Sequence, residues 1–185
     1  MGLLRALFGK KEEEAAPPAR DAGFGKGFVT IPSHDFYGFS SRSPNGRYAV
    51  AWLDGGPDQS RRGRWLFLDG EQVVAKGAMP RPNDGKVADN GVFILNDWGA
   101  IETLSGTLKA FGPDGKSIFA RKFKANLFNN GLSSDGRWAA CQTCNSDHED
   151  AGKLFLFDLV QGTELSSWAP ESGWANGYSP FPKRS

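Results

Sequence analysis

The stretch "SPNGRYAVAW", residues 43–52, joins a turn signal to a run of aromatic and aliphatic residues, and the chain repeats this layout twice. The copies are "ADNGVFILND" at 88–97 and "SSDGRWAACQ" at 133–142. Their Asn-Gly or Asp-Gly pairs begin at residues 45, 90 and 135, so each step is 45 residues. Such pairs suit type I′ turns, whose two central residues need positive φ, and each stretch therefore predicts a β-hairpin.

The segment after each turn has the same pattern of apolar residues in all three copies. At the 45-residue spacing, an aromatic residue and then an aliphatic residue fall on one face of the predicted strand: Tyr48 and Val50, Phe93 and Leu95, Trp138 and Ala140. The opposite face is also apolar, with Ala49, Ile94 and Ala139. A strand that is apolar on both faces is typically buried on both, so we expect sheets stacked between neighbouring sheets.

A second set of turns divides each unit further. Asp69-Gly70 and Asp114-Gly115 are again 45 residues apart, and Gln161-Gly162 is displaced from this spacing by two residues. Turn signals at intervals of about ten residues predict four short strands per unit. The expected fold is all-β, with three four-stranded antiparallel units at about 35–78, 85–125 and 128–169.

This repeat resembles the blades of the WD40-like and TolB-like β-propeller families over roughly residues 35–169, where "SPNG" precedes an aromatic-rich strand and "LFLFD" follows it. The resemblance implies propeller-like blades with their longer loops gathered on one rim. The Trp-Asp and Gly-His signatures of true WD40 repeats are absent from the sequence, so no functional residue is carried over from that family.

Three blades are too few for a closed propeller, which needs about four or more. We expect residues 24–34 to add one strand and residues 170–185 to cap the other end of the β-domain at 24–185. Two interpretations are open: a capped, open stack, or two chains that pair into a six-bladed ring. A twisted β-sandwich is the alternative fold.

Composition limits the classes of function. The chain has 185 residues, 39% of them hydrophobic, and a formal net charge of +1, which predicts one soluble domain without the basic surface of a nucleic-acid-binding protein. No apolar stretch reaches the roughly 20 residues of a membrane span, and no secretory signal is recognisable. We therefore expect a cytoplasmic protein.

Residues 1–23 differ from the rest of the chain. Four apolar residues precede a charge block and an Ala-Ala-Pro-Pro spacer: Leu3, Leu4, Leu7 and Phe8. This tail is interpreted as a disordered terminus, a docking peptide or a weak interfacial membrane anchor. Its basic residues are balanced by acidic ones, which argues against attraction to anionic lipid.

The expected binding surface is the rim that carries the longer loops, since loops carry function more often than strands do. The candidate partner-binding residues lie in three of these loops: Asp54, Asp58, Arg61, Arg62, Trp98, Glu102, Asp147, His148, Glu149 and Asp150. The basic residues of a predicted outer strand, Arg121, Lys122 and Lys124, are interpreted as protection of a sheet edge against unwanted pairing.

Support for catalysis or metal binding is weak. Cys141, Cys144 and His148 suggest zinc, but cysteines three apart on a strand point to opposite faces, so Cys141 is expected in the core and Cys144 at the strand end. The segment "SHD" at 33–35 matches no known nucleophile spacing. We therefore expect no metal or cofactor and a non-enzymatic protein-binding or scaffold module whose partner is another protein or a second copy. The alternatives are a metal-dependent or acidic-residue hydrolase centred on residues 144–150 and a peripheral membrane protein held by residues 3–8.

Overall fold

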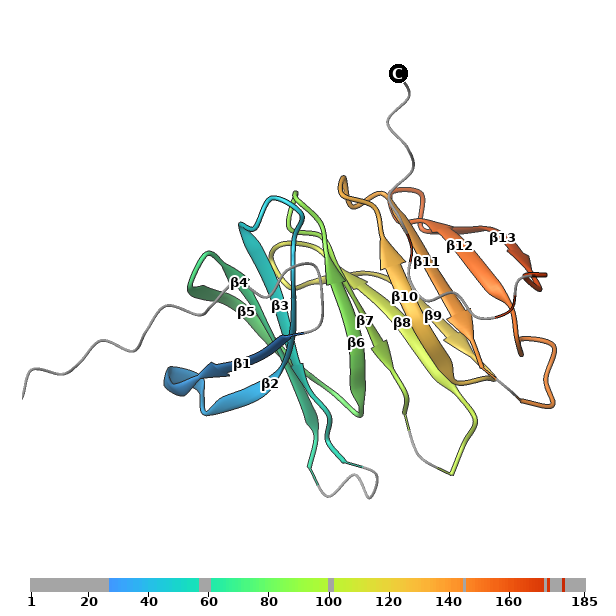
Figure 1. The fold of residues 1–185 in the computed structure, drawn as a ribbon, viewed down its shortest axis with the longest axis horizontal. Coiled ribbons are helices and arrows are strands. Elements are labelled where there is room, and N and C mark those ends of the chain that lie inside the picture. Colours follow the sequence, from blue (N-terminus) through green and yellow to red (C-terminus); the bar gives the residue numbers. More distant parts are fainter. Residues whose placement is uncertain are drawn as a thin grey trace, which may run out of the picture.

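The computed structural model describes residues 27–56, 61–99, 102–144, 146–171, 173 and 178. Within these residues the chain forms thirteen β-strands, one short 3-10 helix and no α-helix (Figure 1). The all-β prediction with three antiparallel sheets is confirmed. The tail at 1–23 and Asp58 lie outside the described residues.

Each sheet is a continuous segment of the chain. Sheet A contains β1 (Gly27–Ile31), β2 (Phe36–Arg42), β3 (Tyr48–Leu53), β4 (Gly63–Asp69) and β5 (Gln72–Met79), with η1 (Pro32–His34) between the first two strands. Sheet B contains β6 (Pro82–Val87), β7 (Phe93–Asp97), β8 (Gly106–Phe111) and β9 (Ser117–Phe123). Sheet C contains β10 (Leu127–Leu132), β11 (Trp138–Thr143), β12 (Leu154–Asp158) and β13 (Thr163–Trp168).

The sheets stack side by side in chain order, and β6 contacts β2 and β3 on one side and β10 on the other (Figure 1). Sheet B is apolar on both faces, as predicted: Phe93 packs toward sheet A, where its ring lies 4.9 Å from that of Phe67, and Ile94 packs toward sheet C. The sheets do not close into a barrel. This open stack is consistent with an open propeller-like arrangement and with a sandwich.

The repeated turns form hairpins, but the predicted turn type is wrong. Gly46, Gly91 and Gly136 have φ values of 76°, 83° and 72°, and the residue before each glycine does not have positive φ. A backbone hydrogen bond closes each turn at the glycine, such as Gly46 N to Ser43 O at 2.8 Å. A side-chain oxygen of the preceding Asn or Asp accepts a backbone N–H two residues on, which fixes the turn without a left-handed residue at that position.

The predicted alignment of the strands after these turns is also wrong. The first and third turns bring residues five apart together, Ser43 N to Tyr48 O and Ser133 N to Trp138 O, whereas the second joins Ala88 N to Val92 O, four apart. The second turn is therefore one residue shorter, and Val92 takes the place of Tyr48 and Trp138. Because side chains alternate along a strand, this shift turns Phe93 toward sheet A, at the position that Ala49 and Ala139 occupy in their own sheets.

Hydrogen bonds connect the three turns to one another at one end of the stack. The Asn45 N–H donates to Asp89 Oδ1 at 2.8 Å, the Asp89 N–H donates to Ser134 O at 2.8 Å, and Asn90 Nδ2 donates to Asp135 O at 2.7 Å. We call this set of contacts the turn ladder. The longer loops lie at the opposite end of the strands (Figure 1).

Each end of the stack carries a cover that is not a repeat unit. On the outer face of sheet A, Val29 and Ile31 of the β1–β2 hairpin pack on a buried cluster: Phe36, Ala49, Ala51, Leu66 and Leu68. On sheet C, the Tyr178 ring lies against Gly131 and its hydroxyl donates to Asn129 Oδ1 at 2.8 Å. The predicted strand within 24–34 is therefore present as β1. A ring formed with a second copy would have to place another sheet on the face that Val29 and Ile31 of β1 now cover.

Candidate functional site

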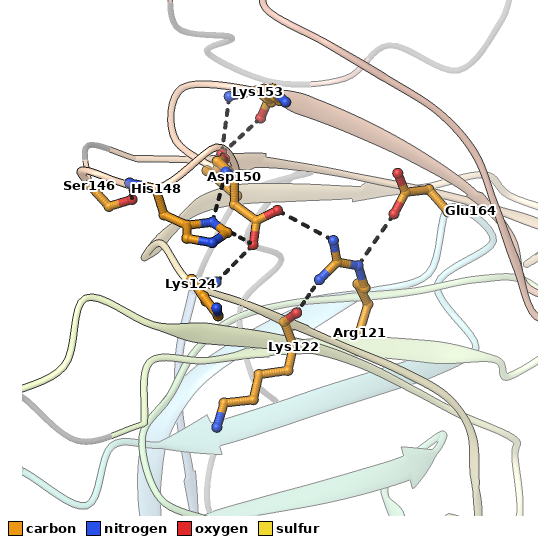
Figure 2. Close-up of polar contacts among 9 residues, drawn as sticks. Arg121, Lys122, Lys124, Ser146, His148, Asp150, Lys153 and Glu164 are labelled. Atoms are coloured by element: carbon orange, nitrogen blue, oxygen red, sulfur yellow. Dashed lines mark hydrogen bonds and ion pairs between the residues drawn. The ribbon is translucent and has the colours of Figure 1, made fainter.

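The acidic loop after β11 places one carboxylate inside the protein and leaves two in solvent. Asp150 is buried, and Asp147 and Glu149 are exposed. The Asp150 carboxylate accepts a hydrogen bond from the Lys124 N–H at 2.9 Å and one from the Arg121 guanidinium at 3.4 Å (Figure 2). Its backbone carbonyl accepts a hydrogen bond from the Thr143 hydroxyl. Asp150 thus ties the loop to sheet B.

Arg121 makes the other half of this connection. From β9 its guanidinium lies between Asp150 and Glu164, with Nε donating to Glu164 Oε2 at 3.3 Å, and it covers the Phe123 ring at 4.6 Å from the centroid (Figure 2). The interpretation of Arg121 as edge protection is wrong, because its side chain turns into the junction of sheets B and C. The side chains of Lys122 and Lys124 are exposed. We call the contacts of Arg121 with Asp150 and Glu164 the Arg121 bridge.

His148 is held by the loop's own backbone. Its Nδ1 accepts the Asp150 N–H at 3.3 Å, so the neutral ring carries its proton on Nε2, and the 3.8 Å separation of Nδ1 from Asp150 Oδ2 is no hydrogen bond. Among the residues that the structure describes, no three His, Cys, Asp or Glu side chains converge as metal ligands. The side chains of His148 and Asp150 thus bind other groups of the protein and stabilise the loop.

The two cysteines lie where the strand pattern predicts. Cys141 is fully buried in the layer between sheets B and C, and Cys144 is half-buried just after β11. Both thiols are free. Burial raises the pKa of each thiol above its ordinary value, which keeps both protonated at neutral pH.

A second cluster joins sheets A and B at the loop end. Arg81 donates to both carboxylate oxygens of Asp54 at 3.3 Å, and its guanidinium lies 5.5 Å from the centre of the Trp98 ring. Trp98 Nε1 in turn donates to Leu127 O at 2.7 Å. Asp54 and Trp98 therefore connect sheets, and the sequence interpretation missed Arg81, which links them.

The other candidates on this rim are exposed: Arg61, Arg62 and Glu102. In the "SHD" segment, the Ser33 hydroxyl lies 3.0 Å from His34 Nδ1 on an exposed hairpin tip. Both residues stand in solvent or near it, with Asp35 in the left-handed region at φ 45°. This contact has the distance of a nucleophile–base pair and lies at the exposed end of the hairpin.

The sequence interpretation also missed a group of exposed aromatic rings on the β1–β2 hairpin. Phe28 is 63% exposed, Tyr37 61% and Phe39 40%. Ring centroids are 5.6 Å apart for Phe28 and Tyr37, 4.4 Å for Phe28 and Phe39, and 6.3 Å for Phe39 and the fully buried Trp52. We call these four rings the aromatic ladder, which leads from the core between sheets A and B into solvent. Aromatic residues in "GFVTI" and "FYGFS" on the face opposite Val29 and Phe36 are the sequence signal for it.

No protein-family model matches the chain, and no curated protein matches it. In the described part of the chain, no helix has the length and apolar character needed to cross a membrane.

Proposed function

We propose that this chain is a non-enzymatic protein-binding module that holds its partner on the aromatic ladder. The observation that supports the proposal is the exposure of Phe28, Tyr37 and Phe39 as one stacked group. Large rings at the centre of protein interfaces supply most of the binding free energy. Because these rings already support one another and rest on Trp52, little side-chain entropy is lost when a partner covers them.

The surface formed by the long loops is a weaker candidate for the main contact with a partner than the aromatic ladder is. Four of the charged side chains at this end already bind one another: Asp54 with Arg81, and Asp150 with Arg121. The exposed charges at the same end, Arg61, Arg62, Glu102, Asp147 and Glu149, suit the polar margin of an interface, where single ion pairs contribute little. To act in a hydrolase, the Asp150 carboxylate would have to break its hydrogen bonds with the Lys124 N–H and with Arg121. A hydrolase at this end is therefore the weaker proposal.

Site-specific photo-crosslinking in living cells tests the proposal. A photoreactive phenylalanine analogue at position 37 should form a discrete adduct with a protein, and the same analogue at Val160, which is 76% exposed on the β12–β13 turn, should not. Adducts of equal yield and identity at both positions would contradict a specific surface.

The affinity of the purified chain for its captured partner gives a second test, which measures the binding free energy that the rings contribute. Removal of two interface rings at about 2 kcal/mol each, about 4 kcal/mol in total, predicts a roughly 1,000-fold weaker interaction for the Phe28→Ala/Tyr37→Ala variant. Val160→Ala should bind like the unaltered chain. Unchanged capture by the double variant, with its thermal unfolding midpoint preserved, would show that the ladder is not the contact surface.

A further inference from the structure

We propose that the partner on the aromatic ladder is a second copy of this chain, joined by antiparallel pairing of the two β1 strands. This inference rests on the proposed function and names the partner for the same site. It is carried by the character of β1 as an edge strand, by the symmetry of the pairing and by the area of the exposed rings.

β1 is the inner edge of sheet A and pairs only with β2 among the described strands. Its residues alternate in exposure: Val29 and Ile31 pack on the buried cluster that contains Phe36, and Phe28 and Thr30 are exposed. Alternate N–H and C=O groups of an edge strand point away from its neighbour and offer a template for another strand. β1 can therefore accept a strand without disturbing the core.

Charge separates β1 from the edge strands at the outer side of the three sheets. The outermost strands carry charged residues: Lys76 in β5, Lys122 in β9 and Glu164 in β13. Such residues on edge strands discourage strand addition. The sequence of β1, "GFVTI", has no charge, and neither does the part of β2 that pairs with it.

Antiparallel pairing of identical strands is two-fold symmetric, so both copies use the same surface. In the register centred on Val29, Phe28 of each copy lies opposite Thr30 of the other. Both aromatic ladders then lie on one face of a continuous sheet. The hairpin tips with Asp35 lie at opposite ends of the shared pair, so like charges do not meet across it.

The exposed area predicts a weak dimer. An aromatic side chain buries about 200 Å², so full coverage of Phe28, Tyr37 and Phe39 at their present exposures would bury about 330 Å² per copy and about 650 Å² in total. Stable interfaces bury roughly 1,200–2,000 Å². Backbone pairing along β1 must add the remainder, and we expect dissociation in the micromolar range or weaker.

Sedimentation velocity of the full chain over a wide range of protein concentrations tests this proposal. The unaltered chain should pass from monomer to dimer as concentration rises. Thr30→Lys should weaken the dimer at least tenfold, since it brings two ammonium groups together near the two-fold axis. Thr163→Lys places the same charge on the exposed edge strand β13 and should leave the dimer unchanged. Backbone amides at 27–31 should exchange more slowly in the dimer.

The possible results separate the two proposals. A monomer at every concentration, or equal weakening by Thr30→Lys and Thr163→Lys, overturns β1 pairing. If crosslinks at position 37 then reach a different protein, the binding function stands and the identity of its partner changes. If a dimer forms and the Phe28→Ala/Tyr37→Ala variant dimerises equally well, the aromatic ladder is not the contact surface and the proposed function fails as well.

Discussion

Replacement of Asp150 by alanine tests whether the buried carboxylate of the loop after β11 is structural. The side chain is buried, accepts the Lys124 N–H and pairs with Arg121. A hydrogen bond to a charged acceptor contributes about 1.5–3 kcal/mol, and a partly exposed ion pair adds up to about 1 kcal/mol. Arg121 keeps Glu164 as a partner, so the expected loss of folding free energy is about 2–3 kcal/mol.

Urea unfolding at neutral pH, followed by tryptophan fluorescence, measures this loss. Asp150→Asn keeps one acceptor for the Lys124 N–H and should lose only about 1 kcal/mol. Asp147→Ala removes an exposed carboxylate from the same loop and is the matched control, with an expected change below about 0.5 kcal/mol. If Asp150→Ala and Asp147→Ala unfold at the same urea concentration, the Arg121 bridge does not stabilise the fold and the structural role given to Asp150 is incorrect.

Three further predictions concern the core, the cover of sheet C and the turns. In the native protein a thiol reagent should label Cys144 slowly and Cys141 only after unfolding, because burial raises the pKa of both thiols. Rapid labelling of both cysteines would contradict their burial. Gly131→Ala should lower the free energy of unfolding by about 1–3 kcal/mol, because its Cβ would lie 2.5 Å from the Tyr178 ring. Tyr178→Ala should relieve most of that loss, and additive losses would count against the contact. A serine hydroxyl and a backbone N–H hold the pKa of Asp135 below 3.8, so its contribution to stability is present at neutral pH and is lost as pH falls below about 4. Asp135→Asn should therefore show a shallower loss of stability between pH 5 and pH 2, and an unchanged slope would contradict this.

The sheets could be predicted because their signals are local. A glycine with positive φ ends each hairpin, as at Gly46 and Gly91, and β7 is apolar on both faces. The orientation of Phe93 could not be predicted from the 45-residue spacing. It depends on one residue less in the turn at 88–92, and a shift of one residue reverses the face of every side chain that follows.

The candidate site was harder to predict because it depends on contacts between distant segments. The alternation of charge in β9 is compatible with an exposed edge, and only the position of sheet C shows that Arg121 meets Asp150 and Glu164. The exposure of Phe28 and Tyr37 likewise depends on how the β1–β2 hairpin folds over sheet A. The alternation of residues in the sequence places these rings on one face of the hairpin, but it does not show whether that face is buried.

The covers at the two ends of the stack restrict how such a chain could lengthen. Sheet B presents apolar residues to both neighbours, with Phe93 on one side and Ile94 on the other. A duplicated copy of residues 82–126 placed after residue 126 would meet surfaces similar to its own on both sides. The same copy fused before β1 or after Tyr178 would meet the hairpin or the C-terminal cover in place of a matching sheet. An added copy of this unit would therefore find apolar partners on both of its faces only in the middle of the stack.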